Sequence, residues 1–343
     1  MRFLVFLDTE EFMDAKITKK RLSHMLSYDW LKIIATAVGV IFIWMAIFTM
    51  TATRIQPSQQ FGVFNFLGTT QNAQNFRNYA SLTDVFSHEI IQTIAGDLTT
   101  GGEEYVYQYT EARMAACEVD AVFVSDSEGS AYQYVTEQGG EPVKATYLEE
   151  FIYRYRNYVY RLDGEDGYLK SMEKYLNGYY NGDYKTGEFD SQKVEKDFRD
   201  YVASSKDKRY KTEESIALGV QNELKRIANY QSALVDFYSY LDLGYISLTE
   251  KTLYYSTKEG IFEYKGVFSI NLCPTEQMEN LKSDVYYRVK DDESGQTKTT
   301  ALNMNLVLTN DQSKRDSFQY ESLVFVNHLV KKHCLALNKT NGN

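Results

Sequence analysis

The chain has 343 residues, and its 37 basic against 47 acidic side chains give a formal net charge of −10 at pH 7. An acidic chain without a basic stripe is poorly suited to binding phosphate backbones, so no nucleic acid is expected as a partner. Cys117, Cys273 and Cys334 cannot all pair within one chain and show no Cys-x-x-Cys spacing, so neither a disulfide framework nor a zinc ribbon is predicted. One optional disulfide, and the redox state of the three thiols, stay open.

An uncharged apolar run extends from residue 33 to residue 53 and is flanked by Lys32 and Arg54. At about 1.5 Å per residue a helix of this length covers roughly 30 Å, the thickness of the hydrocarbon core of a bilayer. The core of a cleaved signal peptide is shorter, about 7 to 15 residues, although the small residues of TMTATR leave cleavage as an alternative. The length therefore predicts a single retained transmembrane helix, with the lipid bilayer of the cytoplasmic membrane as its partner.

Basic residues are concentrated before the apolar run: Lys16, Lys19, Lys20, Arg21 and Lys32 precede it, and only Arg54 follows closely. Because cytoplasmic flanks carry the excess of Lys and Arg, we expect a single-pass protein of the cell membrane, with its N-terminus in the cytoplasm and its C-terminal domain extracellular. Met13 begins a segment that could itself start the protein, so translation from Met1 or from Met13 stays open.

The first part of the C-terminal domain alternates between strand and helix patterns. The predicted elements are a strand at 61–68, a helix at 69–86, a strand at 88–95, a helix at 102–117 and a strand at 119–124. This alternation predicts a parallel sheet with helices packed on it. The run VDAVFV (119–124) is apolar throughout and indicates a central strand that is buried on both faces. Ala112, Ala115 and Ala116 allow the preceding helix to lie close to the sheet.

The remainder of the domain is predicted to be helical at first and then rich in strands. A helix near 130–138 ends at a Gly-Gly break, and a helical, tyrosine-rich region follows, with its longest helix at 217–241. Strand-like runs then occupy 252–256, 260–272, 284–289 and 304–309, and an amphipathic helix at 320–333 closes the domain.

Three successive motifs, EARMAACEVDAVFVSD, AYQYVTEQGG and ATYLEEFI, follow an order that resembles the extracellular solute-binding proteins of bacterial ABC transporters, of the type II periplasmic-binding-protein-like kind. The resemblance covers residues 60–152 and, more weakly, 253–333. The start LSYDWLKII is also similar to a set of poorly characterised, single-anchor membrane proteins of Gram-positive bacteria. The chain has no Cys near residue 54 that could carry a lipid, so the transmembrane helix would replace it. Both Trp residues belong to the membrane segment, whereas sugar-binding members usually place Trp in the cleft.

The resemblance implies an α/β fold in which an N-terminal transmembrane helix is followed by a periplasmic-binding-protein-like, two-lobed domain with a helix-rich middle. The expected segments are a cytoplasmic N-terminal segment (1–32), the transmembrane helix (33–53), a tether (54–60), an α/β lobe (61–152), a helical Tyr-rich region (153–250), a C-terminal α/β part that completes the lobe (251–335) and a tail (336–343).

Ligands of open α/β sheets bind at the carboxyl ends of the parallel strands. This rule nominates Gly68, Thr69 and Thr70 after the first strand, and Ser125 and Asp126 after the third, as ligand-binding residues. The alternative, favoured about two to one, is that both segments are ordinary polar turns. The tyrosines between residues 147 and 184 similarly suit either a recognition surface or, again about two to one, packing between helices.

Neither a catalytic, a cofactor nor a metal site is predicted. The four histidines (His24, His88, His328 and His333) lack a ligand spacing, and the motifs of serine hydrolases, nucleotide-binding loops and zinc proteases do not occur. Adjacent acidic pairs such as Glu149 and Glu150 point apart on a helix, unlike the two carboxylates of a glycosidase. The expected function is therefore a non-enzymatic, solute-capturing accessory subunit beside an ABC permease. The alternative is a structural or interaction subunit of the cell envelope with a degenerate cleft.

Overall fold

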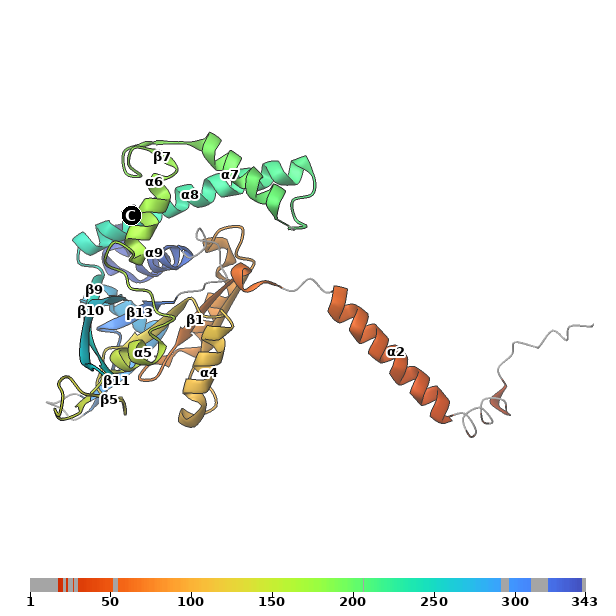
Figure 1. The fold of residues 1–343 in the computed structure, drawn as a ribbon, viewed down its shortest axis with the longest axis horizontal. Helices are drawn as coiled ribbons and strands as arrows, with labels where there is room; N and C mark the ends of the chain where they lie inside the picture. The colour runs from red at the N-terminus through yellow and green to blue at the C-terminus, as the bar shows by residue number, and fades with distance from the viewer. Residues whose placement is uncertain are drawn as a thin grey trace, which may run out of the picture. The chain divides into compact units, whose positions relative to one another are not determined.

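The computed structural model describes residues 18–20, 23, 27, 30–51, 55–205, 207–290, 296–309 and 320–340. The chain divides into two compact units, Met1–Arg54 and Ile55–Asn343. In the first unit, helix α2 (Trp30–Thr51) contains most of the expected transmembrane segment (Figure 1). Within Trp30–Thr49 the mean hydropathy reaches 2.3 and the helix is not buried, so its length and composition suit a signal anchor or a transmembrane helix. Ala52, Thr53 and most of the expected cytoplasmic segment lie outside the described residues.

A six-stranded sheet forms the centre of the second unit, in the order β3-β1-β4-β13-β10-β9 (Figure 1). Its strands are β1 (Gln60–Asn65), β3 (Gln92–Asp97), β4 (Ala121–Ser125), β9 (Ser247–Thr257), β10 (Gly260–Asn271) and β13 (Met304–Leu308). Strand β1 runs parallel to β3 and to β4, whereas β13, β10 and β9 each run antiparallel to the strand before them in the sheet. The predicted parallel sheet is therefore confirmed for β3, β1 and β4 only, and the whole sheet is mixed.

Both faces of the sheet are buried, because alternate residues of the inner strands enter two different hydrophobic clusters. Phe61 and Phe123 belong to one cluster, and Phe64 and Val122 belong to the other. Helices α4 (Glu103–Ala115) and α5 (Tyr147–Tyr155) supply the cover of the second face, and α6 (Tyr168–Asn177), α8 (Glu213–Asp242) and α9 (Glu321–His333) supply that of the first (Figure 1). The result is a three-layer α/β arrangement with β4 as the buried central strand that the sequence predicts.

The second unit also contains elements outside these three layers' main helices and strands. They are η1 (Pro57–Gln59), β2 (Thr70–Gln71), α3 (Ala73–Arg77), η2 (Asn78–Val85), β5 (Gln133–Tyr134), β6 (Val143–Lys144), β7 (Tyr180–Asn181), β8 (Glu188–Phe189), α7 (Ser191–Ser204), η3 (Glu276–Ser283), β11 (Val285–Lys290), β12 (Thr297–Thr300) and α10 (Leu335–Thr340). Strands β12, β11 and β2 form a small sheet, and β5–β6 and β7–β8 form two hairpins.

Three of the predicted elements differ from the structure. The helix expected near 130–138 is wrong, because Gln133 and Tyr134 form β5, and Gly139, with a φ of 76°, helps to turn the chain back towards β6. The helix expected at 69–86 is broken into β2, α3 and the 3₁₀ segment η2, since Thr70 and Gln71 pair with β11 instead. The strand expected at 88–95 begins only at Gln92, where pairing with Gln60 starts.

The two-lobed arrangement implied by the resemblance is not confirmed. Residues 55–343 form one compact unit, and the tyrosine-rich helices contribute Tyr168 and Tyr230 to the hydrophobic cluster on one face of the central sheet. Tyr153 and Tyr155 are likewise buried, on the opposite face. These residues support the packing interpretation of the tyrosines over the recognition interpretation.

Gly62 is a position where the tight packing of the sheet can be tested. An alanine Cβ there would collide with the backbone carbonyl of Glu118, and the backbone cannot move without disturbing the junction of β1 and β4. We predict that Gly62→Ala lowers the free energy of unfolding by about 3 kcal/mol or more, measured by urea denaturation followed by circular dichroism.

Gly139→Ala is the matched control. No atom lies within 4 Å of the added Cβ, so only the strain of a φ of 76° remains. Its expected cost is about 1 kcal/mol. Equal losses in the two variants would contradict the packing explanation.

Candidate functional site

The structure brings together two of the segments that the sequence nominates as ligand-binding. The hydroxyl of Ser125, at the end of β4, donates to the carbonyl oxygen of Gly68 at 3.2 Å and lies 2.8 Å from the hydroxyl of Ser127. Thr69 turns inward and donates its hydroxyl to the carbonyl oxygen of Phe66 at 2.6 Å. Thr70 belongs to β2, where it pairs with Tyr286, so it is part of a second small sheet. The carboxyl ends of β1 and β4 therefore meet, as the parallel pairing requires.

Asp126, the fifth nominated residue, is engaged by groups of the protein itself. Its Oδ1 accepts a hydrogen bond from the Lys251 ammonium at 2.8 Å and another from the Thr146 hydroxyl at 2.7 Å. The same ammonium lies 3.3 Å from Oε1 of Glu149. The side chains of Lys251 and Asp126 are only 15% and 22% exposed, so this is a largely desolvated ion pair. Asp126 thus acts as a partner of β9 and α5 at this edge.

The start of helix α5 covers the same edge. Thr146 and Glu149 form a capping box, in which the Thr146 hydroxyl accepts from the Glu149 backbone N–H at 3.2 Å and the Glu149 carboxylate accepts from the Thr146 N–H at 2.9 Å. The ring of Tyr147 packs against Gly68, which has a φ of 76°, so closely that an alanine there would collide with it. The strand ends at Gly68 and Ser125 are therefore covered by the protein's own side chains, whereas Thr70 is exposed.

The acidic pair Glu149 and Glu150 points apart, as the sequence predicts. Glu149 lies against Lys251, whereas Glu150 is fully buried and accepts from Ser130 at 2.7 Å and from Arg154 at 2.7 Å. Each carboxylate thus has separate partners.

Sequence reasoning missed Lys251, because it lies 125 positions from Asp126 and carries no local signal. The Thr146–Glu149 spacing is a readable capping-box pattern and could have placed the start of α5.

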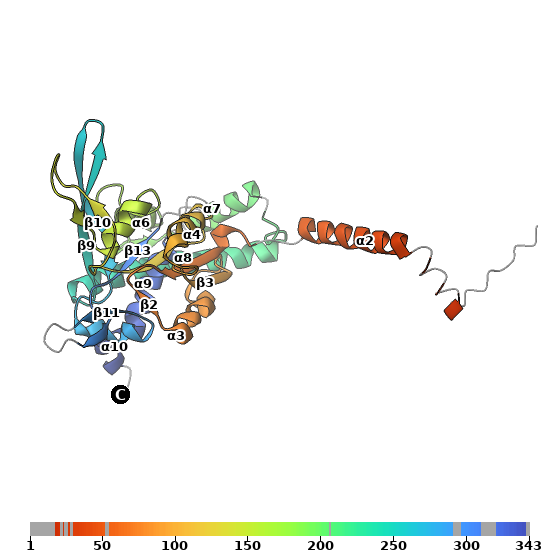
Figure 2. The ribbon, with the colours of Figure 1, turned by 90° about the horizontal axis from the view of Figure 1, so that it is seen from below.

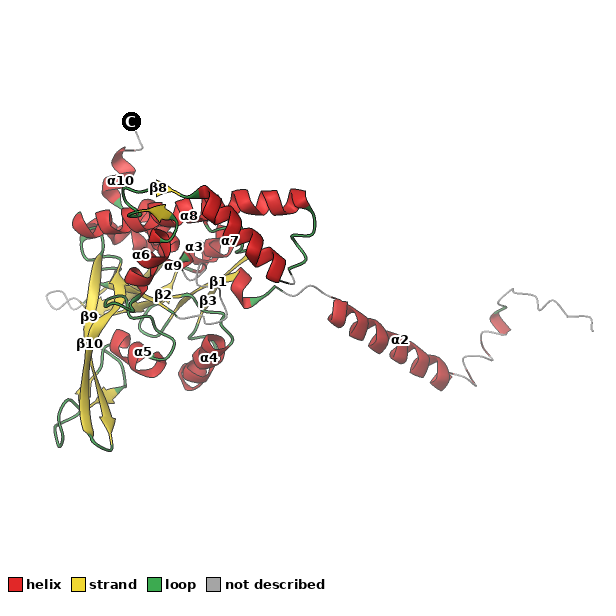
Figure 3. Cartoon of the chain, turned by 45° about the horizontal axis from the view of Figure 1, so that its top comes forward, coloured by secondary structure: helices red, strands yellow, loops and turns green. Residues whose placement is uncertain are grey.

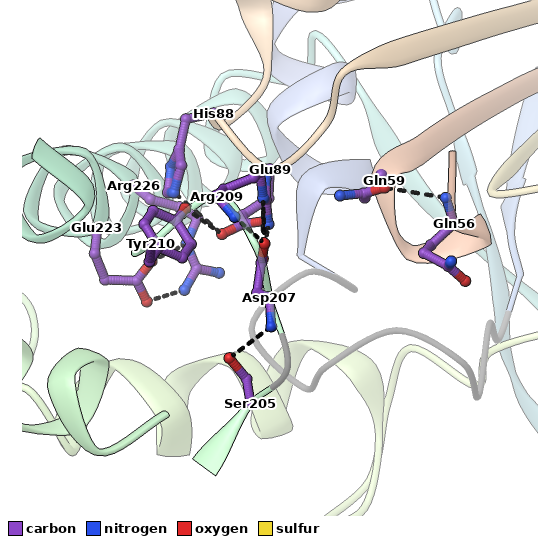
Figure 4. A network of polar contacts seen from close by, with 10 residues as sticks. All are labelled: Gln56, Gln59, His88, Glu89, Ser205, Asp207, Arg209, Tyr210, Glu223 and Arg226. Atoms are coloured by element: carbon purple, nitrogen blue, oxygen red, sulfur yellow. Dashed lines mark hydrogen bonds and ion pairs between the residues drawn. The ribbon is translucent and has the colours of Figure 1, made fainter. Parts of the chain in front are cut away.

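A second polar cluster joins the loop between α7 and α8 to the residues that precede β3 (Figure 4). The guanidinium of Arg209 contacts both Glu89 and Asp207, and the Tyr210 hydroxyl donates to Glu89 at 3.2 Å. His88 Nε2 lies 3.2 Å from Glu89 Oε1, a contact that is close enough for an ion pair but lacks hydrogen-bond geometry. Burial favours a raised pKa for Glu89, but His88 and Arg209 outweigh it and lower that pKa to about 2.

A third cluster is built around Asp284, which is almost fully buried. Its Oδ2 accepts from Tyr79 at 2.6 Å and lies 3.0 Å from His333 Nε2, and the Lys332 ammonium also binds it. Burial opposes ionisation, yet His333, Lys332 and Tyr79 hold the pKa of Asp284 well below its usual range. Because His333 is only 3% exposed, the Asp–His pair faces the interior and ties η3 to the end of α9.

A fourth buried acid, Glu321, lies at the start of α9. Its carboxylate accepts from the Tyr230 hydroxyl at 2.8 Å and from the backbone N–H of Ser87 at 3.3 Å. Burial nevertheless raises the pKa of Glu321, because these contacts do not offset its removal from water.

Among the described residues, no group of three or more His, Cys, Asp or Glu side chains is arranged to hold a metal ion. Cys273 is buried next to Glu279, and burial, together with that carboxylate, raises the pKa of its thiol to about 12. A thiol with such a pKa stays protonated and is a poor nucleophile near neutral pH.

Two of the grooves in the domain are lined entirely by described residues. One, of about 510 Å³, lies between residues 132–139 and residues 254–261, and the other, of about 170 Å³, lies between α8 and α9. Neither is lined by Gly68, Thr69, Thr70, Ser125 or Asp126.

Comparison with known proteins adds no relative: no protein-family model matches the chain, and no curated protein matches it.

Lys251 provides a test of how firmly the strand ends are closed. Replacing it in Lys251→Met leaves Asp126 and Glu149 close together without their shared cation, so we predict a loss of about 2 kcal/mol in unfolding free energy. Lys265→Met is the control on the neighbouring strand. Its pair with Glu250 is more than half exposed, so no measurable change is expected. An unchanged stability of Lys251→Met would contradict the closed edge.

Acid stability provides a second test. A carboxyl whose pKa falls from 4.5 to about 2 on folding stabilises the protein above pH 4.5, and this contribution is lost as the pH falls through 2. For Glu89 it amounts to about 3 kcal/mol. The lowered pKa of Asp284 acts in the same direction as that of Glu89. Glu321 acts in the opposite direction: because its pKa is raised in the folded protein, its contribution to stability is lost as the pH rises above the ordinary pKa of a glutamate.

We therefore predict that Glu89→Gln lowers stability at pH 7 and flattens the loss of stability between pH 4.5 and 2, measured by urea denaturation at each pH. The control Glu137→Gln changes an exposed carboxyl and should leave the curve unchanged. Parallel curves for the wild type and Glu89→Gln would show that Glu89 is not the responsible group.

Proposed function

We propose that this protein is a membrane-anchored subunit of the cell envelope whose extracellular α/β domain contacts another envelope protein. The observation that carries the proposal is the ion pair between Lys251, within β9, and Asp126, directly after the end of β4. The resemblance to solute-binding proteins implies a ligand at this edge, yet here the edge is occupied by protein side chains.

A solute would have to displace several contacts in order to bind there. It would need to separate Lys251 from Asp126 and Glu149, and to move the ring of Tyr147 from Gly68. Breaking a buried pair costs about 3 to 5 kcal/mol, and somewhat less for a pair that keeps some exposure. A weakly held solute does not recover that energy, so the geometry favours a degenerate cleft.

The hairpin of β9 and β10 is the surface that best suits a protein partner. Over Gly260–Val267, strand β10 pairs with β9, whereas its pairing with β13 is confined to Ile270 and Asn271. The hairpin projects from the body of the domain (Figure 2). Phe262 and Tyr264 on this hairpin are 49% and 39% exposed, and large exposed aromatic side chains are common at protein interfaces. A permease or another envelope protein is the expected partner.

Solute capture beside an ABC permease is the second candidate function. It is favoured by the contact between Ser125 and Gly68, since the parallel strands β1 and β4 end together where ligands of such sheets bind. Capture would require the Lys251 contacts to open when the solute arrives.

Photo-crosslinking in intact cells of the host tests the proposed protein contact. A photoreactive phenylalanine analogue at Phe262 or Tyr264 is expected to capture one discrete membrane protein. The same analogue at Leu218, which is 63% exposed on α8, is the control and should not capture it.

Thermal unfolding of the full chain in detergent tests the second candidate function, solute capture. Ligand at 100 times its dissociation constant stabilises a protein by about 2.7 kcal/mol. Such stabilisation by a sugar, an amino acid or a short peptide, abolished in Asp126→Asn, would favour solute capture and overturn the interaction subunit.

A further inference from the structure

One groove of the domain lies far along the β9–β10 hairpin and has no part in the strand-end contacts described above. It has a volume of about 510 Å³ and is open to solvent, between the β5 loop (132–139) and the tip of the hairpin (254–261). The two segments lie side by side in two views (Figures 2 and 3). We name it the tyrosine groove, after Tyr132, Tyr134 and Tyr254, which line it.

The aromatic rings of the tyrosine groove are held in place before any ligand arrives. The rings of Tyr134 and Tyr254 are nearly parallel, with an interplanar angle of 8° and centroids 6.0 Å apart. The ring of Tyr153 packs against those of Tyr134 and Tyr132, with ring centroids 5.0 Å and 5.3 Å apart, respectively. The hydroxyl of Tyr153 accepts a hydrogen bond from the backbone N–H of Tyr254 at 2.6 Å. Fixed rings lose little conformational entropy when a ligand packs against them.

The remaining lining is mostly polar, with Val135 and Ile261 as its apolar side chains. It includes the amides of Gln133 and Gln138 and the hydroxyl of Ser256. Within the described parts of the chain these three side chains make no hydrogen bond. Amides and hydroxyls both donate and accept, so they suit a ligand with many hydroxyl groups.

The charges of the tyrosine groove cancel. Lys258 and Glu259 are adjacent at the hairpin tip and supply one positive and one negative charge to the lining. A phosphate-bearing ligand would need several cations there, and a strongly basic ligand would need several carboxylates. The lining therefore favours a neutral ligand.

We propose that the tyrosine groove binds a neutral carbohydrate chain. The C–H-bearing face of a sugar ring packs on the electron-rich face of an aromatic ring, and its hydroxyl groups bond to the surrounding amides and hydroxyls. The volume falls within the range of about 300 to 1,000 Å³ that small-ligand sites occupy, and an open groove admits a chain that continues at both ends.

The hairpin carries this groove and the exposed aromatics of the proposed protein contact on opposite faces. Phe262 is the cross-strand partner of Tyr255, and Tyr264 that of Leu253, so these four side chains share one face. Tyr254 and Ser256, two positions apart, lie on the other face. Changes on one face can therefore be used as controls for the other, and failure of either proposal leaves the other standing.

Isothermal titration of the full chain in detergent tests the proposal, with maltohexaose, cellohexaose and chitohexaose as probes. At least one of the three is expected to bind. Tyr254→Ala is expected to weaken its binding at least tenfold, and Ser256→Ala, which leaves the rings intact, about threefold. Phe262→Ala, on the opposite face of the hairpin, is the matched control and should bind as the wild type does. Circular dichroism of each variant verifies that the domain is folded.

Three outcomes would overturn the carbohydrate site. The first is no binding of any of the three oligosaccharides at millimolar concentration. The second is binding that Ser256→Ala and a folded Tyr254→Ala leave unchanged, and the third is equal weakening by Phe262→Ala, which would assign binding to another surface. Should Tyr254→Ala fail to fold, Gln138→Ala replaces it, because Gln138 is exposed in the loop and contributes only its amide.

Discussion

Burial of strand β4 on both faces is the constraint on which the domain depends. Ala121, Val122, Phe123 and Val124 are all 0% exposed, although their side chains alternate between the two faces of the sheet. Two helical layers are therefore required, since either face left open would expose aromatic and aliphatic side chains to water. Helices α4 and α5 form the layer on one face, and α6, α8 and α9 form the layer on the other. This requirement explains why the tyrosine-rich helices pack on the sheet.

The same constraint closes the edge where a solute would bind. When α5 packs on the sheet, its first turn lies over the ends of β1 and β4, and polar groups there must find partners because they lose contact with water. Asp126 accepts hydrogen bonds from Lys251 and Thr146, and the ring of Tyr147 packs against Gly68. The ends of β1 and β4 therefore keep the geometry of a ligand-binding edge, while their polar groups bond to other parts of the protein. The buried carboxylates Glu89, Asp284 and Glu321 extend this pattern to the helical layers.

Open surface remains where the chain extends beyond the two layers. The β9–β10 hairpin leaves the sheet, so its faces are only partly covered, and each face acquires a different character from the alternation of its strands. One face carries Phe262 and Tyr264, which suit a protein contact. The other face meets the β5 loop and forms the tyrosine groove. A single supersecondary element thus carries two separate surfaces, and neither requires the strand ends to open.

Elements with a strong local pattern could be predicted from the sequence. The apolar run of α2, the continuous apolar run of β4 and the periodic face of α8 are each dictated by residues close together in the chain. Gly68 and Ser125 could be placed at neighbouring strand ends for the same reason, since parallel strands end together. The β5–β6 hairpin could not, because its two-residue strands have no pattern longer than a turn. Only the tertiary structure decided that Lys251 reaches Asp126 and that the tyrosines of the helical region are packing residues. Both outcomes depend on contacts between distant segments, which exist only after the two faces of the sheet have been covered.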